Sequence, residues 1–395
     1  MNANDVLNDV ARFDFGGCPV LSFYLDIDGG RYSAMQCVER AHQLLRSARR
    51  QLASIGLSAE CIASVEHDID AVTKYCGTEI EWGRYRGLAI FACHSRAYWR
   101  AITLPASEPD QVFIEVVPCL RPLLELRQDY PHYAVALIDQ RKARFFTVDL
   151  GEIKEHEPLK DNVDRRVHSG SYYGLSDKRM ERHVDEQIDA HLKNTARQLD
   201  ALFAENQPEF VVLGGTPNTL AGLRRVLSPN IEARVCSELQ IPSHATCSEV
   251  FADSVVAVHA CGRQAAGQLA IEVRDAAHGN GFGAQGIADT LNALHQRNVE
   301  TLVVDRRFHV PGSRCLSCQR LYESPGECPA CGSVDALPFG DVVEAAVHAA
   351  LQQGAGIKHV FGVPDFREDG IGALLRFRLR NVPVIQSTSE HVVAA

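Results

Sequence analysis

The sequence lacks the features that would place it in a membrane or a secretory pathway. It has no run of roughly 18 consecutive apolar residues, the length that a membrane-spanning helix requires. Its first residues, MNANDVLNDVARFDFGG, contain no basic stretch followed by an apolar one, so we expect no secretory signal peptide. Internal repeats and low-complexity tracts are also absent. The sequence therefore predicts a globular cytoplasmic protein without a membrane partner.

Positive charge is scarce as well. Lysine and arginine number 40 against 50 aspartates and glutamates, and the formal net charge is -10. If the chain is divided at residues 130 and 270, each part is acidic overall. A protein that binds free DNA is therefore not expected, and any contact with nucleic acid has to come from local basic patches.

Two familiar catalytic signatures are missing from the middle of the chain, namely the P-loop and the H-E-x-x-H zinc motif. The glycine-rich segment GNGFGAQG follows a helical pattern and not a strand, which excludes dinucleotide binding of the Rossmann type. His168 and Ser169 are adjacent, but no third group that would orient them can be named. The sequence therefore predicts no catalytic residues.

Cysteine is plentiful, with thirteen in the chain. Without a secretion signal, these thiols are expected to be reduced. The segment CLSCQRLYESPGECPACGS places Cys315, Cys318, Cys328 and Cys331 in a C-x2-C-x9-C-x2-C arrangement. Four thiolates at this spacing can surround Zn²⁺ at about 2.3 Å, and because they leave no open position the ion would be structural. A disulfide pair and an iron–sulfur site remain the alternatives.

Apolar runs and helical periodicities alternate along the chain, which predicts an α/β protein. The expected strands are 18–27, 85–93, 98–105, 210–215, 233–242, 300–305, 357–363 and 382–388, with a hairpin over 132–153. The expected helices are 34–55, 176–203, 248–277, 284–297 and 341–353, with one more beginning at Pro217. Ser176 and Thr216 are the predicted N-caps of two of them.

The same pattern divides the chain into three predicted α/β domains. They comprise residues 1–130, a middle domain with a mixed sheet over 131–277, and a C-terminal domain over 278–395. The cysteine insert occupies 312–333 of the last domain. Four glycines in HGNGFGAQG (278–286) suggest a hinge between the second and third domains.

One segment of the middle domain is strongly basic. RRVHSGSYYGLSDKRMERH (165–183) contains five cations and only Asp177 and Glu181 to oppose them, a formal charge of +3. Cations on a loop and on the first turns of a helix can contact RNA phosphates, and tyrosines can stack on unpaired bases. The alternative is an ordinary solvated helix start. The candidate RNA-binding residues are Arg165, Arg166, His168, Tyr172, Tyr173, Gly174, Lys178, Arg179 and Arg182.

The order of these features resembles the archaeal and eukaryotic class 1 release factor and Pelota family, and more closely its bacterial relatives, the Balon-like ribosome-binding factors. YGLSDKRMER (173–182) is similar to the family's GGQSARRFER segment, and DGIGALLRF (369–377) to GGIAAILRF. The cysteine insert resembles the archaeal zinc ribbon. The resemblance implies a three-domain release-factor-like architecture with a zinc-ribbon insert in the last domain.

The chain departs from that family at its functional motifs. Tyr173, Gly174 and Leu175 stand where the family has Gly-Gly-Gln, and the first domain lacks the codon-reading Asn-Ile-Lys-Ser motif. The resemblance therefore implies a ribosome-associated factor that occupies the A site and points its basic loop toward the peptidyl transferase centre without hydrolysing peptidyl-tRNA. Ribosome hibernation and the handling of stalled ribosomes are the implied roles.

Two other interpretations stay open. One is an enzyme, a peptidyl-tRNA hydrolase or release factor that acts in ribosome rescue. The other is an RNA- or GTPase-binding adaptor that works outside the A site. The partners that the resemblance implies are the ribosome, through rRNA of the A site, and a GTPase of the elongation-factor-Tu type.

Overall fold

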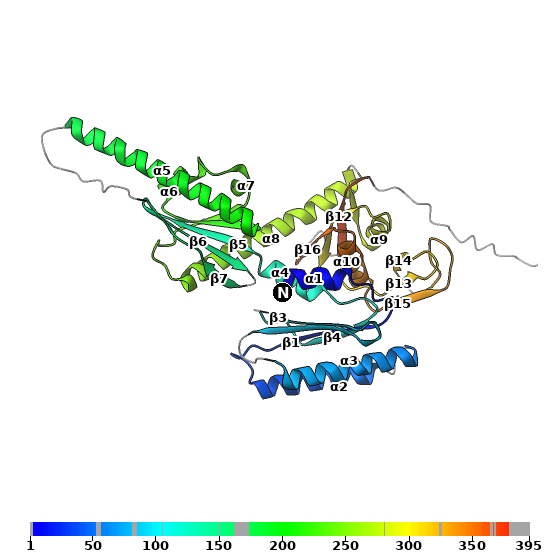
Figure 1. The fold of residues 1–395 in the computed structure, drawn as a ribbon. Helices are drawn as coiled ribbons and strands as arrows, with labels where there is room; N and C mark the ends of the chain where they lie inside the picture. Colours follow the sequence, from blue (N-terminus) through cyan, green and yellow to red (C-terminus); the bar gives the residue numbers. More distant parts are fainter. Residues whose placement is uncertain are drawn as a thin grey trace, which may run out of the picture. The chain divides into compact units, whose positions relative to one another are not determined.

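The computed structural model describes residues 3–378 except 53–56, 81–84, 105, 150, 162–173, 280, 324–325, 364–365 and 367–368. The described chain is α/β, as the sequence predicts, and its strands form four sheets (Figure 1). It divides into two compact units. Residues 129–264 form what we call the middle unit, and residues 1–128 together with 265–395 form the N/C unit. The predicted hairpin, the mixed middle sheet and most of the predicted helices are present.

The sheet of the middle unit is mixed. Its strand order is β10-β9-β5-β6-β7, with β8 also paired to β6. β5 and β6 form the predicted antiparallel hairpin, and its turn is held by Asp139, whose Oδ1 accepts the N–H groups of Arg141 and Lys142 at 2.8 Å. β9 and β10 run parallel to β5. The strands are β5 (Tyr133–Ile138), β6 (Lys142–Asp149), β7 (Glu152–Glu155), β8 (Leu159–Lys160), β9 (Phe210–Gly215) and β10 (Val235–Leu239).

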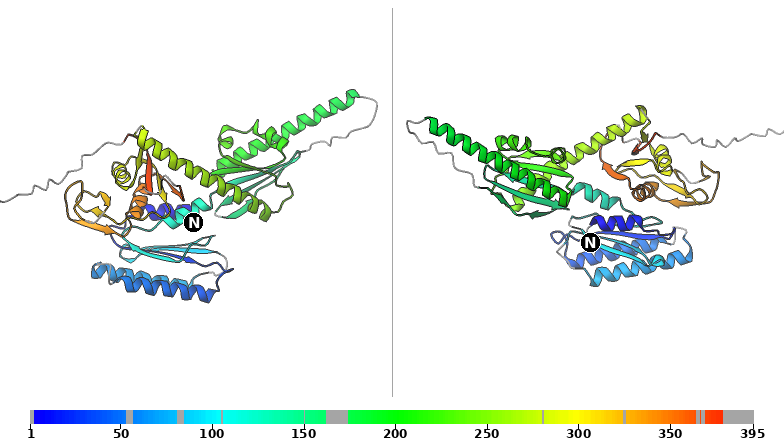
Figure 2. Two further views of the ribbon diagram at one scale, coloured as in Figure 1. Left: turned by 180° about the vertical axis from the view of Figure 1, so that it is seen from behind. Right: turned by 45° about the horizontal axis from the view of Figure 1, so that its top comes forward.

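Helices cover both faces of this sheet, as Figure 2 shows. Because side chains alternate along a strand, Ala134 and Ala136 of β5 face one helical layer and Val135 faces the other. The first layer contains α5 (Gly174–Asn206), α6 (Pro217–Arg224) and α7 (Pro229–Glu232). The second is the N-terminal part of α8 (Cys247–Gly279). Both sides of the sheet are therefore buried.

One helix start was predicted correctly and one was not. Thr216 is the N-cap of α6, and its side chain accepts a hydrogen bond from the N–H of Thr219. α5 begins at Gly174, two residues before the predicted N-cap Ser176. A serine cap contributes only about 1 kcal/mol, which does not prevent a long helix from extending over two more residues.

The first sheet of the N/C unit is antiparallel, with the order β3-β2-β1-β4. Its strands are β1 (Val20–Asp26), β2 (Gly87–Cys93), β3 (Tyr98–Leu104) and β4 (Gln111–Glu115). α2 (Ala34–Leu52) and α3 (Ala59–Thr78) pack on one face through an apolar core that includes Phe23, Leu45 and Val72. α1 (Ala3–Arg12), a short 3-10 helix (His94–Arg96) and α4 (Arg121–Asp129) complete this part.

The second sheet of the N/C unit has the order β11-β17-β12-β16, in which only β12 and β16 are parallel. Its strands are β11 (Gly283–Gln285), β12 (Val299–Asp305), β16 (Gly356–Val360) and β17 (Ile371–Leu375). α9 (Ile287–His295) and α10 (Val342–Gln352) contact this sheet. Ala270 and Val273 of α8 pack against Val303 and Phe366. The strand predicted over 382–388 lies outside the described residues.

The hinge predicted at 278–286 is wrong for part of that segment, because Gly283–Gln285 form β11. A Cβ atom at Gly283 would lie 2.5 Å from the backbone nitrogen of Ala277, so this glycine permits a close approach of strand and helix. The division between the two units falls inside α8, after Gln264. Among the described residues, no helix is both long and apolar enough to cross a membrane, α5 and α8 included.

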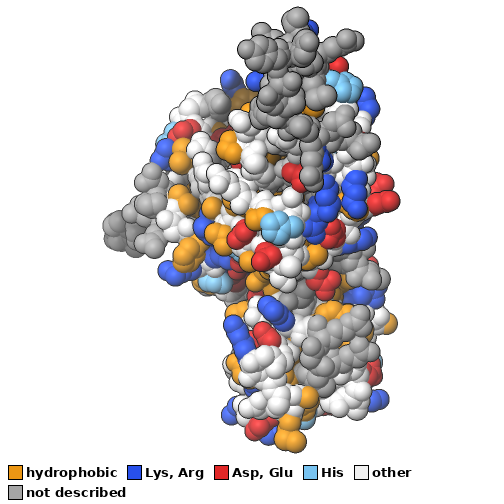
Figure 3. Space-filling view, turned by 90° about the vertical axis from the view of Figure 1, so that its left-hand side faces the viewer, with side chains coloured by type: hydrophobic (Ala, Val, Ile, Leu, Met, Phe, Trp, Pro, Cys, Tyr) orange, Lys and Arg blue, Asp and Glu red, His pale blue; other side chains and the backbone are white. Residues whose placement is uncertain are grey.

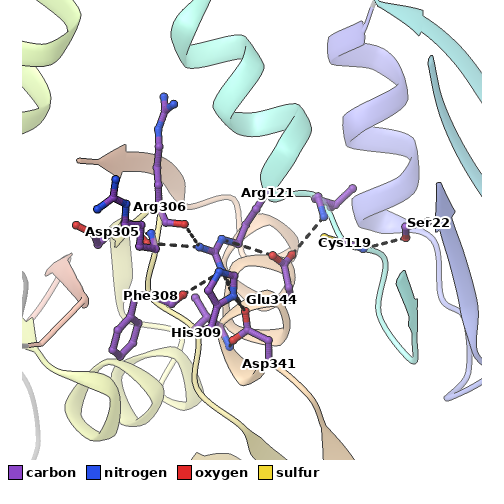
Figure 4. A network of polar contacts seen from close by, with 12 residues as sticks. Ser22, Cys119, Arg121, Asp305, Arg306, Phe308, His309, Asp341 and Glu344 are labelled. Carbon is purple, nitrogen blue, oxygen red and sulfur yellow. Dashed lines mark hydrogen bonds and ion pairs between the residues drawn. The ribbon is translucent and has the colours of Figure 1, made fainter. Parts of the chain in front are cut away.

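A buried arginine joins segments of the N/C unit that are far apart in sequence (Figure 4). Arg121, only 4% exposed, donates to the carbonyl oxygens of Phe308 at 3.1 Å and Arg306 at 3.0 Å. Its guanidinium also pairs with Asp341 at 3.0 Å and lies 3.5 Å from Glu344. These contacts tie the start of α4 to the loop after β12 and to the start of α10.

Hydrogen bonds hold β1 to the chain before α4 and join the N-terminal segment to the C-terminal one. Within the N-terminal segment, the hydroxyl of Tyr24 donates to the carbonyl of Cys119 at 2.6 Å, and the N–H of Cys119 donates to Ser22 at 3.0 Å. The side chain of Gln128 pairs with both backbone groups of His359. The N-terminal and C-terminal segments therefore fold as one unit although the middle unit separates them in the sequence.

The burial of Glu344 predicts a pH dependence of stability. Burial raises its pKa to about 7, although Arg121 opposes the shift. Between pH 4.5 and 7 the folded chain keeps a proton that the unfolded chain releases, so this group stabilises the fold at low pH and loses that contribution as pH rises. Glu344→Gln removes the titration. As the pH rises from 4.5 to 7, the free energy of unfolding of the variant should therefore increase by about 3 kcal/mol relative to that of wild type.

Urea unfolding at several pH values, followed by tryptophan fluorescence, measures this difference. Both tryptophans, Trp82 and Trp99, fall within residues 1–128, so the signal reports on the N/C unit. The same substitution at the exposed Glu60 is the matched control. A Glu344→Gln difference that stays constant from pH 4.5 to 7.5 contradicts the prediction.

Candidate functional site

The four predicted cysteine ligands converge in the insert of the N/C unit. The sulfur atoms of Cys315, Cys318, Cys328 and Cys331 all lie within 4.8 Å of one another. Cys315 is 3.5 Å from Cys331, and Cys318 is 3.5 Å from Cys328, sulfur to sulfur. These separations are far longer than the roughly 2.05 Å of a disulfide. All four are free thiols.

A small antiparallel sheet and tight turns bring these cysteines together. Its order is β14-β13-β15, with β13 (Gly312–Cys315), β14 (Leu321–Glu323) and β15 (Ala336–Phe339). Cys315 ends β13, and the turn after it brings Cys318 back. The N–H of Gly332 donates to the carbonyl of Cys328 at 2.8 Å, in a turn where Gly332 has a positive φ of 69°. The glycine is needed there because other residues rarely adopt this conformation.

The chemistry of this cluster suits a metal ion. Thiolates about 2.3 Å from a tetrahedral centre are about 3.8 Å from each other, close to the observed spacing. The N–H of Cys318 points at the sulfur of Cys315 at 3.4 Å and lowers the pKa of the Cys315 thiol to about 6. Burial raises the pKa of Cys318 to about 12. The four cysteines together can hold one metal ion and leave no protein ligand missing.

The basic segment is only partly described. Arg165, Arg166, His168, Tyr172 and Tyr173 lie outside the described residues. Gly174, Lys178, Arg179 and Arg182 are on the first turns of α5, and the side chain of Arg182 is exposed.

This start of α5 projects beyond the sheet of the middle unit in Figures 1 and 2. Val184 is the first fully buried side chain along the described part of α5. Arg182 therefore precedes the first buried side chain that the structure describes on α5.

A polar contact fixes the chain just before the basic loop. Asp161 is the last described residue before the loop, and its carboxylate lies 2.7 Å from Nδ1 of His191 on α5. Asn194, one turn further along, donates to the same carboxylate at 3.4 Å. His191 is completely buried. This contact holds the entry to the loop against the helix on which the loop ends.

The sequence did not predict the contact between Asp161 and His191. His191 and Asp161 are 30 residues apart, and neither belongs to a recognisable motif. Histidine on the apolar side of a helix was the single available signal, and it does not name a partner. On the face drawn in Figure 3, basic and acidic side chains of the described residues are interspersed.

A family model matches part of the chain. Residues 118–260 match the family model described as bacterial archaeo-eukaryotic release factor family 10. This range contains almost the whole middle unit and the entire basic segment. Over this range the chain is similar to the bacterial release-factor-like proteins, which confirms the resemblance found in the sequence.

Two mycobacterial proteins are similar to this chain over most of its length. The chain is 24% identical to the uncharacterized protein Rv2629 of Mycobacterium tuberculosis strain H37Rv and to MT2704 of strain CDC 1551. Each match extends over 379 residues, 92% of this chain and 94% of the relative. The mycobacterial relatives therefore match nearly the full length of this chain.

Several solved structures of low identity are also similar. Ribosome-bound archaeal Pelota, solved with ABCE1, is 11% identical with a TM-score of 0.41, covering 96% of this chain and 95% of that one. Dom34 of S. cerevisiae is 8% identical with a TM-score of 0.38, covering 75% and 80%. The archaeal termination factor aRF1 is 14% identical with a TM-score of 0.26, covering 95% and 99%.

Proposed function

We propose that the protein is a cytoplasmic, ribosome-binding translation factor that enters a vacant A site and directs its 165–182 segment toward the peptidyl transferase centre. The observation that carries the proposal is the match to the release-factor family over residues 118–260, because it includes this segment. The projecting start of α5 supports it, since a protruding helix can reach into a confined RNA site.

The segment is proposed to bind RNA without performing chemistry. Its cations would neutralise phosphates, and Tyr172 and Tyr173 would stack on unpaired bases. Tyr173 and Leu175 replace the first glycine and the glutamine of the family motif. Hibernation or stalled-ribosome handling is the role that a non-hydrolysing occupant of the A site would serve.

The cysteine cluster is proposed to hold a structural zinc ion. When bound, zinc would cross-link the two turns of the insert and stabilise its small sheet. Four protein ligands leave no open coordination position, so no reaction is assigned to this site. A GTPase of the elongation-factor-Tu type is the proposed delivery partner, as the resemblance implies.

Competition for the A site tests the proposal. The purified protein is sedimented with ribosomes whose A site is either vacant or filled by tRNA. We expect binding to the vacant ribosomes and a loss of at least tenfold in affinity when tRNA fills the site. Equal binding to both would favour the adaptor that works outside the A site, and no binding to either would refute the proposal.

We also predict that the protein does not release peptide from ribosome-bound peptidyl-tRNA. The resemblance implies that the family uses the glutamine backbone to position the hydrolytic water, and here Leu175 replaces that glutamine while only the middle glycine of the motif is kept. A reconstituted release assay with labelled peptidyl-tRNA and an authentic release factor as positive control measures this. Multiple-turnover release that is abolished by a change in the 165–182 segment would establish the hydrolase alternative.

A further inference from the structure

A hollow of about 120 Å³ lies at one edge of the second sheet of the N/C unit. It follows the ends of β12 and β16, the two neighbouring parallel strands. In open α/β sheets, ligands bind preferentially outside the carboxyl ends of parallel strands. The residues that line this hollow, called here the stacking pocket, are Asp305, Arg307, Phe308, Phe361 and Gly362.

A cation and an aromatic ring meet in the stacking pocket. The guanidinium of Arg307 lies over the ring of Phe361, 4.6 Å from its centroid. Phe361 is nevertheless 61% exposed. The arginine and the ring hold each other in place while leaving flat surfaces open to solvent.

The rest of the pocket is rigid. The Oδ1 atom of Asp305 accepts the N–H of Arg307 at 2.8 Å, which fixes the turn after β12. Phe308 packs directly on Gly370, where an added Cβ atom would lie 1.9 Å from the ring. The carbonyl of Phe308 is held by buried Arg121. The position of the stacking pair is therefore set before any ligand arrives.

Cations lie near this edge of the sheet, of which Arg121 is buried and paired with Asp341 and Glu344 and is therefore not offered to a ligand. His359, two residues before Phe361, has its pKa lowered to about 3, first by burial and then by the charges of Arg121, Arg306 and Lys358. Lys358 is exposed. Among the groups that line the pocket, Asp305 is the one carboxylate, and its side chain is buried and engaged with the backbone.

We propose that the stacking pocket binds one unpaired base of a single-stranded RNA, with the base stacked on the Arg307–Phe361 pair and the neighbouring phosphates near the surrounding cations. Unpaired bases stack on aromatic rings and on guanidinium planes, and phosphates add attraction that does not depend on sequence. Binding of a protein segment in the same pocket is the alternative that the capture experiment distinguishes. Phe361 is the one large exposed apolar side chain among the described pocket residues.

This inference adds a contact to the proposed function and rests on it only for the identity of the RNA, which would then be ribosomal. The basic segment belongs to the middle unit, and the stacking pocket belongs to the N/C unit. The protein would hold RNA at two independent places.

Fluorescence anisotropy with a short labelled oligo-adenosine RNA tests the pocket. The full chain is used with Arg165, Arg166 and Arg179 changed to Gln, so that the basic segment does not mask a second contact. In this background we expect Phe361→Ala to weaken binding roughly tenfold, the loss of one base stack, and to leave the salt dependence unchanged. Arg307→Lys keeps the charge but loses the plane, so it should also weaken binding.

Phe377→Ala is the matched control, because Phe377 is 69% exposed, belongs to the same unit and does not line the pocket. The RNA affinity of this control should equal that of the triple-Gln background. The melting temperature should be the same in both phenylalanine variants as in that background. Wild-type affinity in Phe361→Ala, or an equal loss in Phe377→Ala, overturns the inference. If Phe361→Ala instead abolishes capture of a protein from ribosome-free extract while oligonucleotide binding is intact, the pocket is a protein site and the inference is wrong.

Ribosome sedimentation separates this inference from the proposed function. If wild type sediments with ribosomes but the pocket variants bind RNA normally, the function stands and the pocket assignment fails. If wild type does not sediment but Phe361→Ala still loses oligonucleotide, the pocket assignment stands and the ribosomal function fails.

Discussion

Protein purified without chelators should contain close to one zinc ion per chain, and Cys315→Ser should lose it. Cys315 is buried, and its sulfur lies 3.5 Å from that of Cys331. A serine hydroxyl at this position would remove one of the four proposed thiolate ligands. Structural zinc sites contribute on the order of 10 kcal/mol to the folding of small domains. We therefore expect the insert together with β15, which ends at Phe339, to unfold locally in the variant.

Elemental analysis measures the metal, and limited proteolysis locates the damage. Cleavage should appear inside the insert after Cys315→Ser or after prolonged chelation, while the middle unit resists the protease. Cys61→Ser, a partly exposed cysteine outside the cluster, is the matched control and should keep both the metal and the resistance. Metal-free wild-type protein with an intact insert would show that the cluster is not a zinc site.

Reversal of Arg165, Arg166 and Arg179 to Glu should weaken ribosome association by on the order of 100-fold. Each lost phosphate contact also lowers the slope of log affinity against log salt by up to about one. Tyr172→Ala and Tyr173→Ala should reduce affinity while barely changing that slope, because stacking releases no counterions. Sedimentation with ribosomes across a salt series measures both quantities.

Arg225→Glu is the control for this experiment, because Arg225 is an exposed arginine of the same unit outside the basic segment. It should bind ribosomes almost as well as wild type. A triple reversal that sediments like wild type at every salt concentration would mean that the segment is a solvated helix start and that the ribosome, if bound, is held elsewhere.

The sequence correctly predicted the features that depend on residues close together along the chain. The hairpin β5–β6 follows from alternating apolar residues around a turn, and the cap of α6 follows from Thr216-Pro217. The cysteine cluster was predictable because each C-x2-C pair closes its own turn, so that only two turns had to meet. The resemblance to the release-factor family was recognisable from the order of such local segments.

Long-range structure was not accessible in this way. Arg121 pairs with Asp341 and Glu344 more than 200 residues later, and no local pattern marks an arginine that will be buried. The division inside α8 was missed for a related reason, since one continuous helical pattern does not reveal that its two ends pack in different cores. Glycine composition suggested a hinge where β11 instead uses Gly283 for close packing.

The sequence by itself determined the α/β class, most helices and strands, the cluster of four cysteines and the location of the basic segment. Tertiary structure alone decided that the two ends of the chain share one unit, that His191 anchors the entry to the basic loop, and that Arg307 and Phe361 meet beside a hollow. The physical reason is that helix periodicity, strand alternation and turn chemistry act over a few residues. Burial and ion pairing instead depend on which distant segments the folded chain brings together.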